Sequence, residues 1–349
     1  MHGHYGSHGS RPWLIYALGG GWGHLTRALA FARLAARRVP VRVMTNSSCV
    51  QTVLESAAFR KEAAALDLQV WSLPAGWGRE QVARRIEELL ACEWEVLLVD
   101  SFPRGLGGEL APMLEGRTYA GSGLRVLVHR DLAPEYVRAA ALEDFVRAHY
   151  DLVLVPGEAS APLAHLGVYT APWLVRDPTE LPARAVLRQR LGLTAAQPTV
   201  VVVAAGRTDE AGFWGAIAAR IAAACPGLAV RCLAAACPPA CPPELWVSHW
   251  PGIEVLAAAD VAVGGGGYHT VHECAALGLP LVACARPRLY DRQTIRLNTG
   301  RPSVSPLAAH LSQLLGLPAL SFARCGNGAP EAIRWVERVK DMSSARDSP

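Results

Sequence analysis

Short apolar segments alternate with amphipathic helical patterns along the chain, and no other feature restricts its fold as strongly. The runs at 13–18 and 199–204 are apolar almost throughout, as expected of strands that are buried on both faces. Strands that alternate with helices are typical of parallel sheets covered by helices. We therefore predict an α/β chain with parallel sheets. The predicted helices include 24–38, 48–61, 79–90 and 134–150.

The alternation is interrupted at 171–182, where three prolines occur within twelve residues. A proline-rich break of this kind is typical of a linker between domains. A chain of 349 residues also has the length of about two domains. We predict a flexible tail at 1–12, an N-terminal domain at 13–170, the linker at 171–182, a C-terminal domain at 183–329 and a closing helix at 330–342.

Composition excludes several classes of protein. Hydrophobic residues make up 51% of the chain, which excludes an intrinsically disordered protein. The net charge of +4 is spread along the chain, whereas nucleic-acid binding needs a concentrated basic surface. The chain has nine cysteines, an odd number, and no secretory signal precedes them, which favours reduced thiols. Cys232, Cys237 and Cys241 form a cluster, but the second Cys pair or His pair of a zinc site does not follow it. We predict a cytoplasmic protein with reduced thiols, no metal and no nucleic-acid partner.

A membrane contact stays open at the level of sequence. No apolar stretch approaches the roughly 20 residues of a membrane-spanning helix. Trp71, Trp77, Arg79, Arg84 and Arg85 form an apolar patch with a basic rim, which is typical of proteins peripheral to the inner face of a membrane. An ordinary amphipathic helix with a solvated basic face explains the same residues.

A glycine-rich turn follows the first predicted strand, and His24 stands at the start of the helix after it. Glycines at 19, 20, 21 and 23 let a ligand approach the backbone closely, and a helix N-terminus favours negative charge. The spacing departs from a dinucleotide fingerprint, because His24 stands where that motif has glycine or alanine. An imidazole at the carboxyl edge of a parallel sheet can act as a general base. A histidine that only caps the helix is the alternative.

A second glycine turn ends a strand of the C-terminal half, and another helix begins after it. The N–H groups of Gly265, Gly266 and Gly267 can cradle a diphosphate, to which Thr270 adds a hydroxyl. Glu273 lies one helical turn further on and can accept both hydrogen bonds of a ribose diol. A carboxylate that merely favours the helix dipole is the alternative for Glu273.

A third candidate group follows the next strand, at Asp291, Arg292 and Gln293. An acid and an amide side by side suit the recognition of hydroxyl groups. A solvated loop explains these three residues equally well when they are taken alone.

Taken together, these groups resemble a known family. The segment 259–282, with its glycine turn, Thr270 and Glu273, resembles the donor-binding signature of GT-B glycosyltransferases, and is most similar to the MurG-like branch, which adds N-acetylglucosamine to a lipid-linked acceptor. The run 291–293 falls where that branch places sugar-binding residues. The element from Gly21 to Arg27 is equally similar to the Gly-x-Gly-His-x-x-Arg of a nucleotide-sugar hydrolase of pseudaminic acid synthesis. Asp100 and Ser101 are similar to an Asp-Ser pair in these relatives.

The resemblance implies two Rossmann-like domains that face each other across a cleft. The C-terminal domain would hold a nucleotide-sugar donor of the UDP type, with 246–250 lining the base pocket, and the N-terminal domain would hold the acceptor. Glu273 is assigned to the ribose, Thr270 and the glycines to the diphosphate, and Gln293 with Asp291 to the sugar hydroxyls. The donor-binding residues implied in this way are Gly21, Gly23, Gly206, Arg207, Val247, Gly265, Gly266, Gly267, Thr270, Glu273, Asp291 and Gln293.

The chain contains no Asp-x-Asp pair of the kind that holds a metal in many glycosyltransferases. Helix N-termini, backbone N–H groups and Arg207 are expected to stabilise the leaving diphosphate instead. We predict inverting, metal-independent and cofactor-free transfer of a sugar, expected to be a hexosamine, in which His24 deprotonates the acceptor hydroxyl. Asp100 either orients His24 or is itself the base. The sequence does not identify the acceptor, and a lipid-linked molecule and a small glycan both fit.

Three other functions fit the same residues. A nucleotide-sugar hydrolase would use water as the acceptor. A non-hydrolysing sugar-nucleotide epimerase would change the sugar on the same fold. A nucleotide-sugar-binding protein without catalysis would bind the donor and not turn it over.

Overall fold

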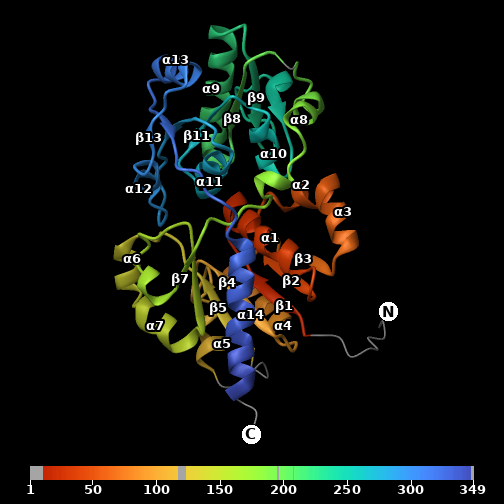
Figure 1. The fold of residues 1–349 in the computed structure, drawn as a ribbon. Helices are drawn as coiled ribbons and strands as arrows, with labels where there is room; N and C mark the ends of the chain where they lie inside the picture. The colour runs from red at the N-terminus through yellow and green to blue at the C-terminus, as the bar shows by residue number, and fades with distance from the viewer. Residues whose placement is uncertain (1–10, 117–122, 195, 207, 347–349) are drawn as a thin grey trace.

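The structure is a computed structural model that describes residues 11–116, 123–194, 196–206 and 208–346. Most of the predicted tail at 1–12 thus lies outside the described residues. Two seven-stranded sheets form the framework, one in each half of the chain. In Figure 1 the N-terminal half lies below and the C-terminal half above, with the helices α1 (Trp22–Ala35) and α11 (Tyr268–Leu277) near the middle.

The sheet of the N-terminal half is parallel throughout. Its central strands are buried on both faces, which explains their continuous apolar sequences. The chain builds two strands, the second and the third, to one side of the first strand and then returns to its other side for the remaining four. In spatial order the strands are β3 (Leu68–Ser72), β2 (Val41–Thr45), β1 (Trp13–Tyr16), β4 (Val96–Asp100), β5 (Leu124–Val128), β6 (Leu152–Pro156) and β7 (Val168–Thr170).

The sheet of the C-terminal half repeats this plan and adds an antiparallel edge. Five strands are parallel, and the last two in space run antiparallel to their neighbours. The antiparallel strands come from residues 299–329, for which the sequence predicted no strand. In spatial order the strands are β10 (Trp246–Val247), β9 (Ala229–Leu233), β8 (Thr199–Val203), β11 (Val261–Gly265), β12 (Leu281–Cys284), β14 (Ala319–Ser321) and β13 (Arg301–Pro302).

Helices cover both faces of each sheet, and the helix predicted at 79–90 is confirmed as α4. The remaining helices of the N-terminal half are α2 (Val50–Glu55), α3 (Ala57–Ala65), α5 (Ala111–Glu115), α6 (Pro134–Ala139) and α7 (Leu142–His149). Those of the C-terminal half are α8 (Arg184–Arg190), α9 (Ala211–Ala224), α10 (Gly252–Ala257), α12 (Gln293–Leu297) and α13 (Pro306–Leu315).

Two predicted helices are each broken in two, so the prediction of one continuous helix is wrong at 48–61 and 134–150. Between α2 and α3 the backbone of Ser56 is extended, and its hydroxyl accepts a hydrogen bond from the N–H of Phe59. Ser56 thus caps a new helix. Between α6 and α7 the backbone of Ala141 adopts a left-handed conformation, with φ of 43°, which ends the first helix.

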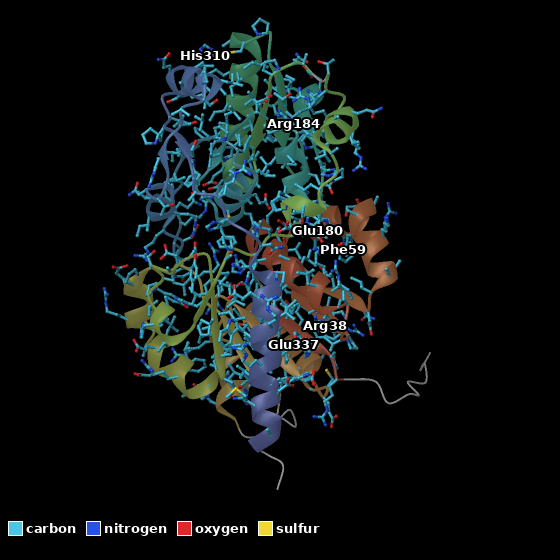
Figure 2. All side chains as sticks on the ribbon, in the orientation of Figure 1. Arg38, Phe59, Glu180, Arg184, His310 and Glu337 are labelled. Carbon is cyan, nitrogen blue, oxygen red and sulfur yellow. The ribbon has the colours of Figure 1, made fainter. Side chains whose placement is uncertain are left out.

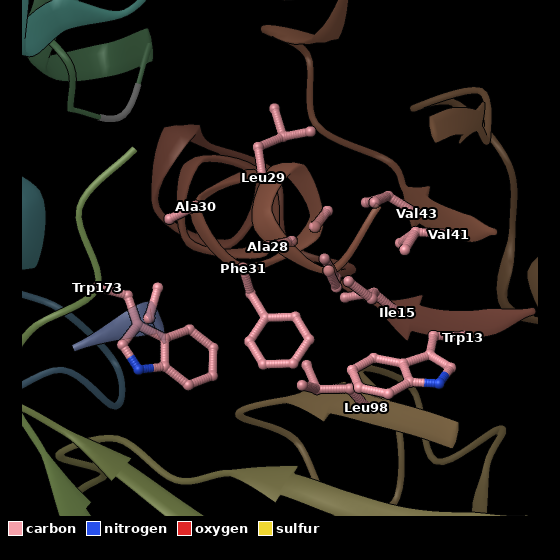
Figure 3. Packing of buried hydrophobic residues seen from close by; sticks show 14 of the residues in the cluster. Trp13, Ile15, Ala28, Leu29, Ala30, Phe31, Val41, Val43, Leu98 and Trp173 are labelled. Carbon is pink, nitrogen blue, oxygen red and sulfur yellow. The ribbon is translucent and has the colours of Figure 1, made fainter. Parts of the chain in front are cut away.

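The chain crosses between the halves twice, and the two crossings lie side by side. The N–H of Gly328 donates to the carbonyl of Pro172 at 2.9 Å, and the amide of Asn327 exchanges two hydrogen bonds with the backbone of Leu174. Trp173 in the first crossing is completely buried and packs on Phe31 of α1, with ring centroids 5.2 Å apart. Figure 3 shows both rings in the core of the N-terminal half. The predicted linker at 171–182 is therefore partly a core element.

The last helix, α14 (Ala329–Arg346), returns to the N-terminal half after the second crossing. Its apolar side packs on α1 and on β5, β6 and β7, where Ala332, Ile333 and Val336 are buried. An ion pair joins Glu337 of α14 to Arg38, which follows α1, and Figure 2 labels both residues. Among the described residues, no helix has both the length and the apolar character needed to cross a bilayer.

Candidate functional site

Each sheet reverses its strand order at one point, between β1 and β4 in one half and between β8 and β11 in the other. The loops that leave such a point diverge, and α/β folds bind ligands in the crevice between them. The two points meet at the seam between the halves. Helix α1, after β1, contacts α11, after β11, and Nε2 of His269 donates to the carbonyl of Gly23 at 3.1 Å. The predicted catalytic and diphosphate-binding groups thus lie at facing edges.

The structure brings the two predicted catalytic residues, His24 and Asp100, into direct contact. His24 is in the first turn of α1, and Asp100 is the last residue of β4, the neighbour of β1. Nδ1 of His24 lies 3.0 Å from Oδ2 of Asp100, and the imidazole stacks on the ring of Phe102. Asp100 is buried, while 17% of the His24 side chain is exposed. A ligand at the seam can therefore reach the imidazole but not the carboxylate.

Arg27 fixes the charge of Asp100. Its Nε donates to Oδ1 at 2.9 Å and its Nη2 donates to Oδ2 at 2.8 Å, and the guanidinium is completely buried. Burial alone raises the pKa of Asp100, but the charges of Arg27, His24 and Arg130 outweigh burial and hold that pKa well below its usual range. The Asp100 carboxylate is therefore a permanent anion behind the imidazole.

The first glycine turn shapes the space around His24. A Cβ on Gly19 would lie 2.2 Å from Cδ2 of the His24 ring, so only glycine lets the imidazole take this place. Gly21 is the N-cap of α1, and its carbonyl accepts a hydrogen bond from the hydroxyl of Ser47 at 3.0 Å. Both glycines predicted to bind the donor, Gly21 and Gly23, thus have carbonyls that are already hydrogen-bonded within the protein.

The second glycine turn joins β11 to α11, and Gly267 is the N-cap of that helix. A Cβ on Gly266 would lie 2.9 Å from Cγ of Leu297 and 3.1 Å from Cβ of Gln293, so the turn packs closely on α12. Thr270 follows in the first turn of α11, with its hydroxyl 3.8 Å from the position of a Cβ on Gly267. The predicted diphosphate group is therefore assembled at one helix N-terminus.

Glu273 lies one turn further along α11 and is buried. Burial raises the pKa of Glu273 to about 8. Within the described residues neither arginine nor lysine forms an ion pair with it, and Nδ1 of His269 lies 3.8 Å from its Oε1. Burial also lowers the pKa of His269 well below its usual value. This part of α11 thus holds a neutral acid beside a neutral imidazole at pH 7.

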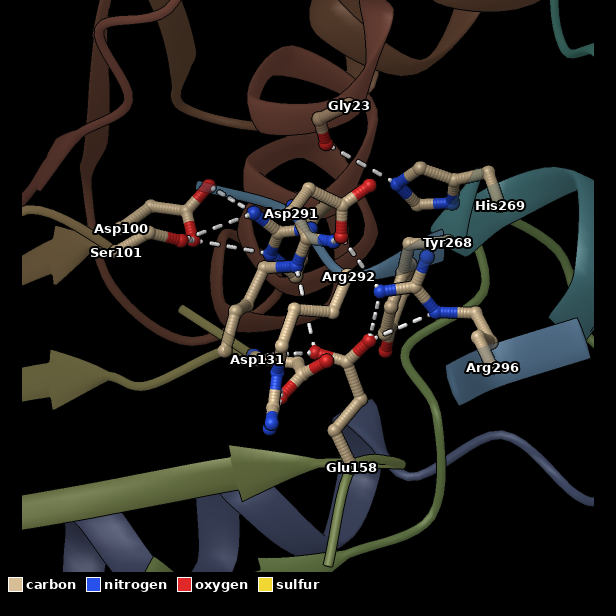
Figure 4. Close-up of polar contacts among 12 residues, drawn as sticks. Gly23, Asp100, Ser101, Asp131, Glu158, Tyr268, His269, Asp291, Arg292 and Arg296 are labelled. Atoms are coloured by element: carbon tan, nitrogen blue, oxygen red, sulfur yellow. Dashed lines mark hydrogen bonds and ion pairs between the residues drawn. The ribbon is translucent and has the colours of Figure 1, made fainter. Parts of the chain in front are cut away.

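Asp291 takes part in an ion network between the halves, drawn in Figure 4. Its Oδ1 accepts hydrogen bonds from Arg130 at 3.1 Å and from Arg296 at 2.7 Å. Burial alone raises the pKa of Asp291, but these two arginines outweigh burial and lower it to about 2. Gln293 is buried, and its Oε1 accepts a hydrogen bond from the N–H of Arg286 at 3.0 Å. The Gln293 side chain also hydrogen-bonds the Asp291 carboxylate, which helps to lower the pKa of Asp291, so the two predicted sugar-binding residues contact each other.

The same network contains residues that the sequence analysis did not select. Glu158, after β6, accepts a hydrogen bond from Nε of Arg296 at 2.8 Å, and Asp131, after β5, pairs with Arg292. The signal that could have found Asp131 and Glu158 is the one used for Asp100, because each stands just beyond the carboxyl end of an apolar strand. Tyr268 has no such signal. Its ring lies 5.1 Å from the guanidinium carbons of both Arg27 and Arg130.

The turn after β8 carries two of the remaining predictions, Gly206 and Arg207. Gly206 is exposed, and Arg207 lies outside the described residues.

The last of the remaining predictions, Val247, ends β10, and its carbonyl accepts a hydrogen bond from the N–H of Ala234 at 3.1 Å. This carbonyl thus takes part in the hydrogen bonding of the sheet edge, within the segment predicted to line the base pocket.

A cavity of about 1260 Å³ opens between α2 and α3 of the N-terminal half and the ends of β9 and β10. Of the predicted base-pocket segment, Trp246, Ser248, His249 and Trp250 line it, and Val247 does not. The guanidinium of Arg176 lies in its wall, 5.8 Å from the Trp250 ring. None of the predicted catalytic, glycine or α11 residues lines this cavity.

Metal ligands were not predicted. In the part of the chain that the structure describes, no group of three or more His, Cys, Asp and Glu side chains is arranged to hold a metal ion.

No family model matches the chain, and no curated protein sequence matches it. Solved structures do. UGT2 of Phytolacca americana, complexed with UDP-2-fluoro-glucose and pterostilbene, is 15% identical over 88% of this chain and 89% of its own, with a TM-score of 0.50. TcCGT1 in complex with UDP is 12% identical over 82% and 83%, also with a TM-score of 0.50. The glycotransferase of kitacinnamycin is 15% identical over 83% of each chain, with a TM-score of 0.47.

At these identities the likeness shows the fold alone. Two Rossmann-like halves with largely parallel sheets are common to this chain and to the structures that it matches. The fold predicted from the glycine turns and the strand pattern is confirmed: the chain has the GT-B fold.

Proposed function

We propose that the protein is an inverting glycosyltransferase that moves a sugar from a UDP-type donor to an acceptor hydroxyl, without a metal. One observation carries the proposal. His24, held on an ionised Asp100, lies in the first turn of α1, and this turn contacts His269 of α11, the helix that follows the glycine turn of the other half. A base on one side and an anion-binding turn on the other are the two groups that sugar transfer from a nucleoside diphosphate requires.

His24 is the base in this proposal, and Asp100 positions it. Nδ1–H of His24 donates to Asp100, which leaves Nε2 to accept the proton of the acceptor hydroxyl. The Asp100 carboxylate then stabilises the imidazolium that forms. Asp100 is a poor base itself, because Arg27, Ser101 and His24 occupy its oxygens and its pKa is low. A single base on the acceptor side supports direct displacement at the anomeric carbon, with inversion.

The donor in this proposal extends along the carboxyl edge of the C-terminal sheet. The nucleoside occupies the cavity lined by Trp246 and Trp250, and the diphosphate lies at the turn before α11. The complexes of two structural neighbours with UDP and with UDP-2-fluoro-glucose support a UDP-type donor. A hexosamine as the sugar and the MurG-like branch rest on the sequence resemblance alone.

A donor panel tests the proposal. UDP-, dTDP- and GDP-sugars are incubated with the protein without an acceptor, and nucleoside diphosphate release and binding are both measured. We expect one donor to bind with little release, and Glu273→Ala to abolish that binding. His165→Ala, which changes an exposed histidine paired with Glu143, is the control and should behave as wild type. The acceptor search then uses lipid-linked molecules and small glycans with the donor that binds.

Three outcomes contradict the transferase. Rapid release of nucleoside diphosphate without an acceptor, lost in Glu273→Ala, identifies a nucleotide-sugar hydrolase. Conversion of the sugar without net release of nucleoside diphosphate identifies an epimerase. No binding of any donor means that the fold is shared and the function is not. A requirement for Mg²⁺ would refute the metal-independent reaction while leaving the transfer itself intact.

A further inference from the structure

Two arginines from the loop after β12 reach the crevice of the C-terminal sheet. The backbone N–H of Arg286 donates to Gln293, and Cγ of Arg286 lies 3.9 Å from the position of a Cβ on Gly265. Nη2 of Arg288 lies 3.6 Å from the position of a Cβ on Gly206. The arginines thus flank the point where β8 and β11 diverge. Both are accessible, with 30% and 20% of their side chains exposed.

Glu210 forms ion pairs with both arginines. Nη2 of Arg288 donates to Oε2 at 2.7 Å, its Nη1 pairs with Oε1, and Nε of Arg286 lies 3.4 Å from Oε1. The carboxylate is buried and stands at the N-cap of α9, directly after the turn that leaves β8. A Cβ on Gly206 would lie 2.4 Å from Oε2, so the carboxylate lies against the loop backbone. The crevice is therefore already occupied by an anionic group of the protein itself, the Glu210 carboxylate.

The two arginines can pair with another anion in place of Glu210. The planar fork of an arginine pairs in the same way with a carboxylate and with a phosphate. Glu210 contacts both arginines, and the charges of Asp291 and Asp209 act on Arg288 as well. A diphosphate presents two anionic groups, one for each arginine, whereas Glu210 presents a single carboxylate.

Resting on the proposed function, we propose that Arg286 and Arg288 bind the diphosphate of the nucleotide donor, and that Glu210 holds their place until the donor displaces it. Glu210 then acts as a built-in competitor, which lowers the apparent affinity by the fraction of protein in which it is bound to the arginines. When the donor binds, the arginines release Glu210 and pair with the diphosphate. They then stabilise the charge that develops on the leaving group.

Calorimetric titration of the full chain with UDP and with inorganic pyrophosphate tests this assignment. Glu210→Gln keeps the size of the side chain and removes the competing charge, so it should bind both probes about fivefold or more tightly than wild type. Arg288→Ala should bind both about tenfold or more weakly. The control is Asp260→Asn. It removes a carboxylate held between Arg184 and Arg188 at the opposite edge of the same strands, and it should leave both affinities unchanged.

Unchanged or weaker binding in a folded Glu210→Gln variant overturns the assignment, because a purely structural ion pair predicts no gain in affinity. If that variant does not fold, Glu210→Asp, with its shorter reach, should tighten binding by a smaller factor, and equal affinity overturns the assignment. Wild-type turnover of a UDP-sugar by Arg288→Ala overturns it while the proposed function stands. The expected pyrophosphate affinities together with no binding of any nucleotide-sugar support the anion site and refute the proposed function instead.

Discussion

The two glycine-rich turns are similar in sequence, yet they place opposite charge states at the seam. Beside the first turn, Asp100 at the end of β4 is buried against the equally buried Arg27, and the arginine keeps it ionised. After the second turn, Glu273 is buried without such a partner, and burial raises its pKa to about 8. Burial by itself makes an acid neutral, whereas burial beside a guanidinium makes it a permanent anion. A strand, a glycine turn and a helix therefore do not determine the charge of the acid beside them.

The largest expected effect concerns the base that rests on the permanent anion. His24→Ala should reduce sugar transfer by about 100- to 10,000-fold, the range found when a general base is removed. The side chain is partly exposed, so stability should change little. Initial rates with the identified donor and acceptor, together with a thermal melt, measure both quantities. Wild-type rates would refute the assignment of His24 as the base.

The second effect is on stability. Asp100→Asn leaves the buried Arg27 without a charge partner, and breaking such a pair costs about 3–5 kcal/mol. Urea unfolding of the variant measures this loss. Asp67→Asn, which breaks an exposed ion pair with Arg42, is the control, and its cost should stay below about 1 kcal/mol. If both variants lost the same unfolding free energy, the buried pair of Asp100 with Arg27 would stabilise the protein no more than an exposed ion pair does.

The third effect separates the two acids by pH. The pKa of Glu273 is higher in the folded protein than in the unfolded chain, so the unfolded state binds fewer protons and stability falls as pH rises from about 4.5 towards 8. Relative to Glu273→Gln, wild type should lose about 2 kcal/mol between pH 5 and pH 7. Urea unfolding at both pH values measures the difference. Parallel pH profiles for wild type and variant would show that Glu273 is ionised when buried.

The smallest effect tests how closely the first turn fits the imidazole. Gly19→Ala places a methyl group on the His24 ring and should lower transfer about tenfold, because a shift of the base costs rate without removing it. Gly20→Ala is a matched control, since a Cβ there meets nothing within 4 Å. Equal rates for the two alanine variants would mean that the ring moves aside without cost.

The strands and both glycine turns follow from local sequence, and a contact with His24 is one of the two roles expected of Asp100. Apolar runs predict the strands, and parallel strands bring the residues at their carboxyl ends to one edge. The division into domains at 170 and 183 stays a prediction, as do the roles of the donor-binding residues.

Other features depend on partners distant in sequence, which no local pattern contains. Asp291 is paired with Arg130, 161 residues away, and this pairing determines whether its carboxylate oxygens are available to a ligand. The breaks at Ser56 and Ala141 depend on a single hydroxyl and a single left-handed residue inside strong helical patterns. The edge strands β13 and β14 are short and have no apolar alternation to reveal them.

The return of α14 to the N-terminal half has a consequence for how the chain is made. On the ribosome the N-terminal sheet emerges before the C-terminal sheet, but the helix that covers β5, β6 and β7 is synthesised only after both. Trp173 and the neighbouring core of Phe31 therefore stay incompletely covered while the whole C-terminal half is being made. Domains of most proteins finish folding in the order of their synthesis. In this chain the half that is made first is completed last, and the second half folds while the first still waits for its final helix.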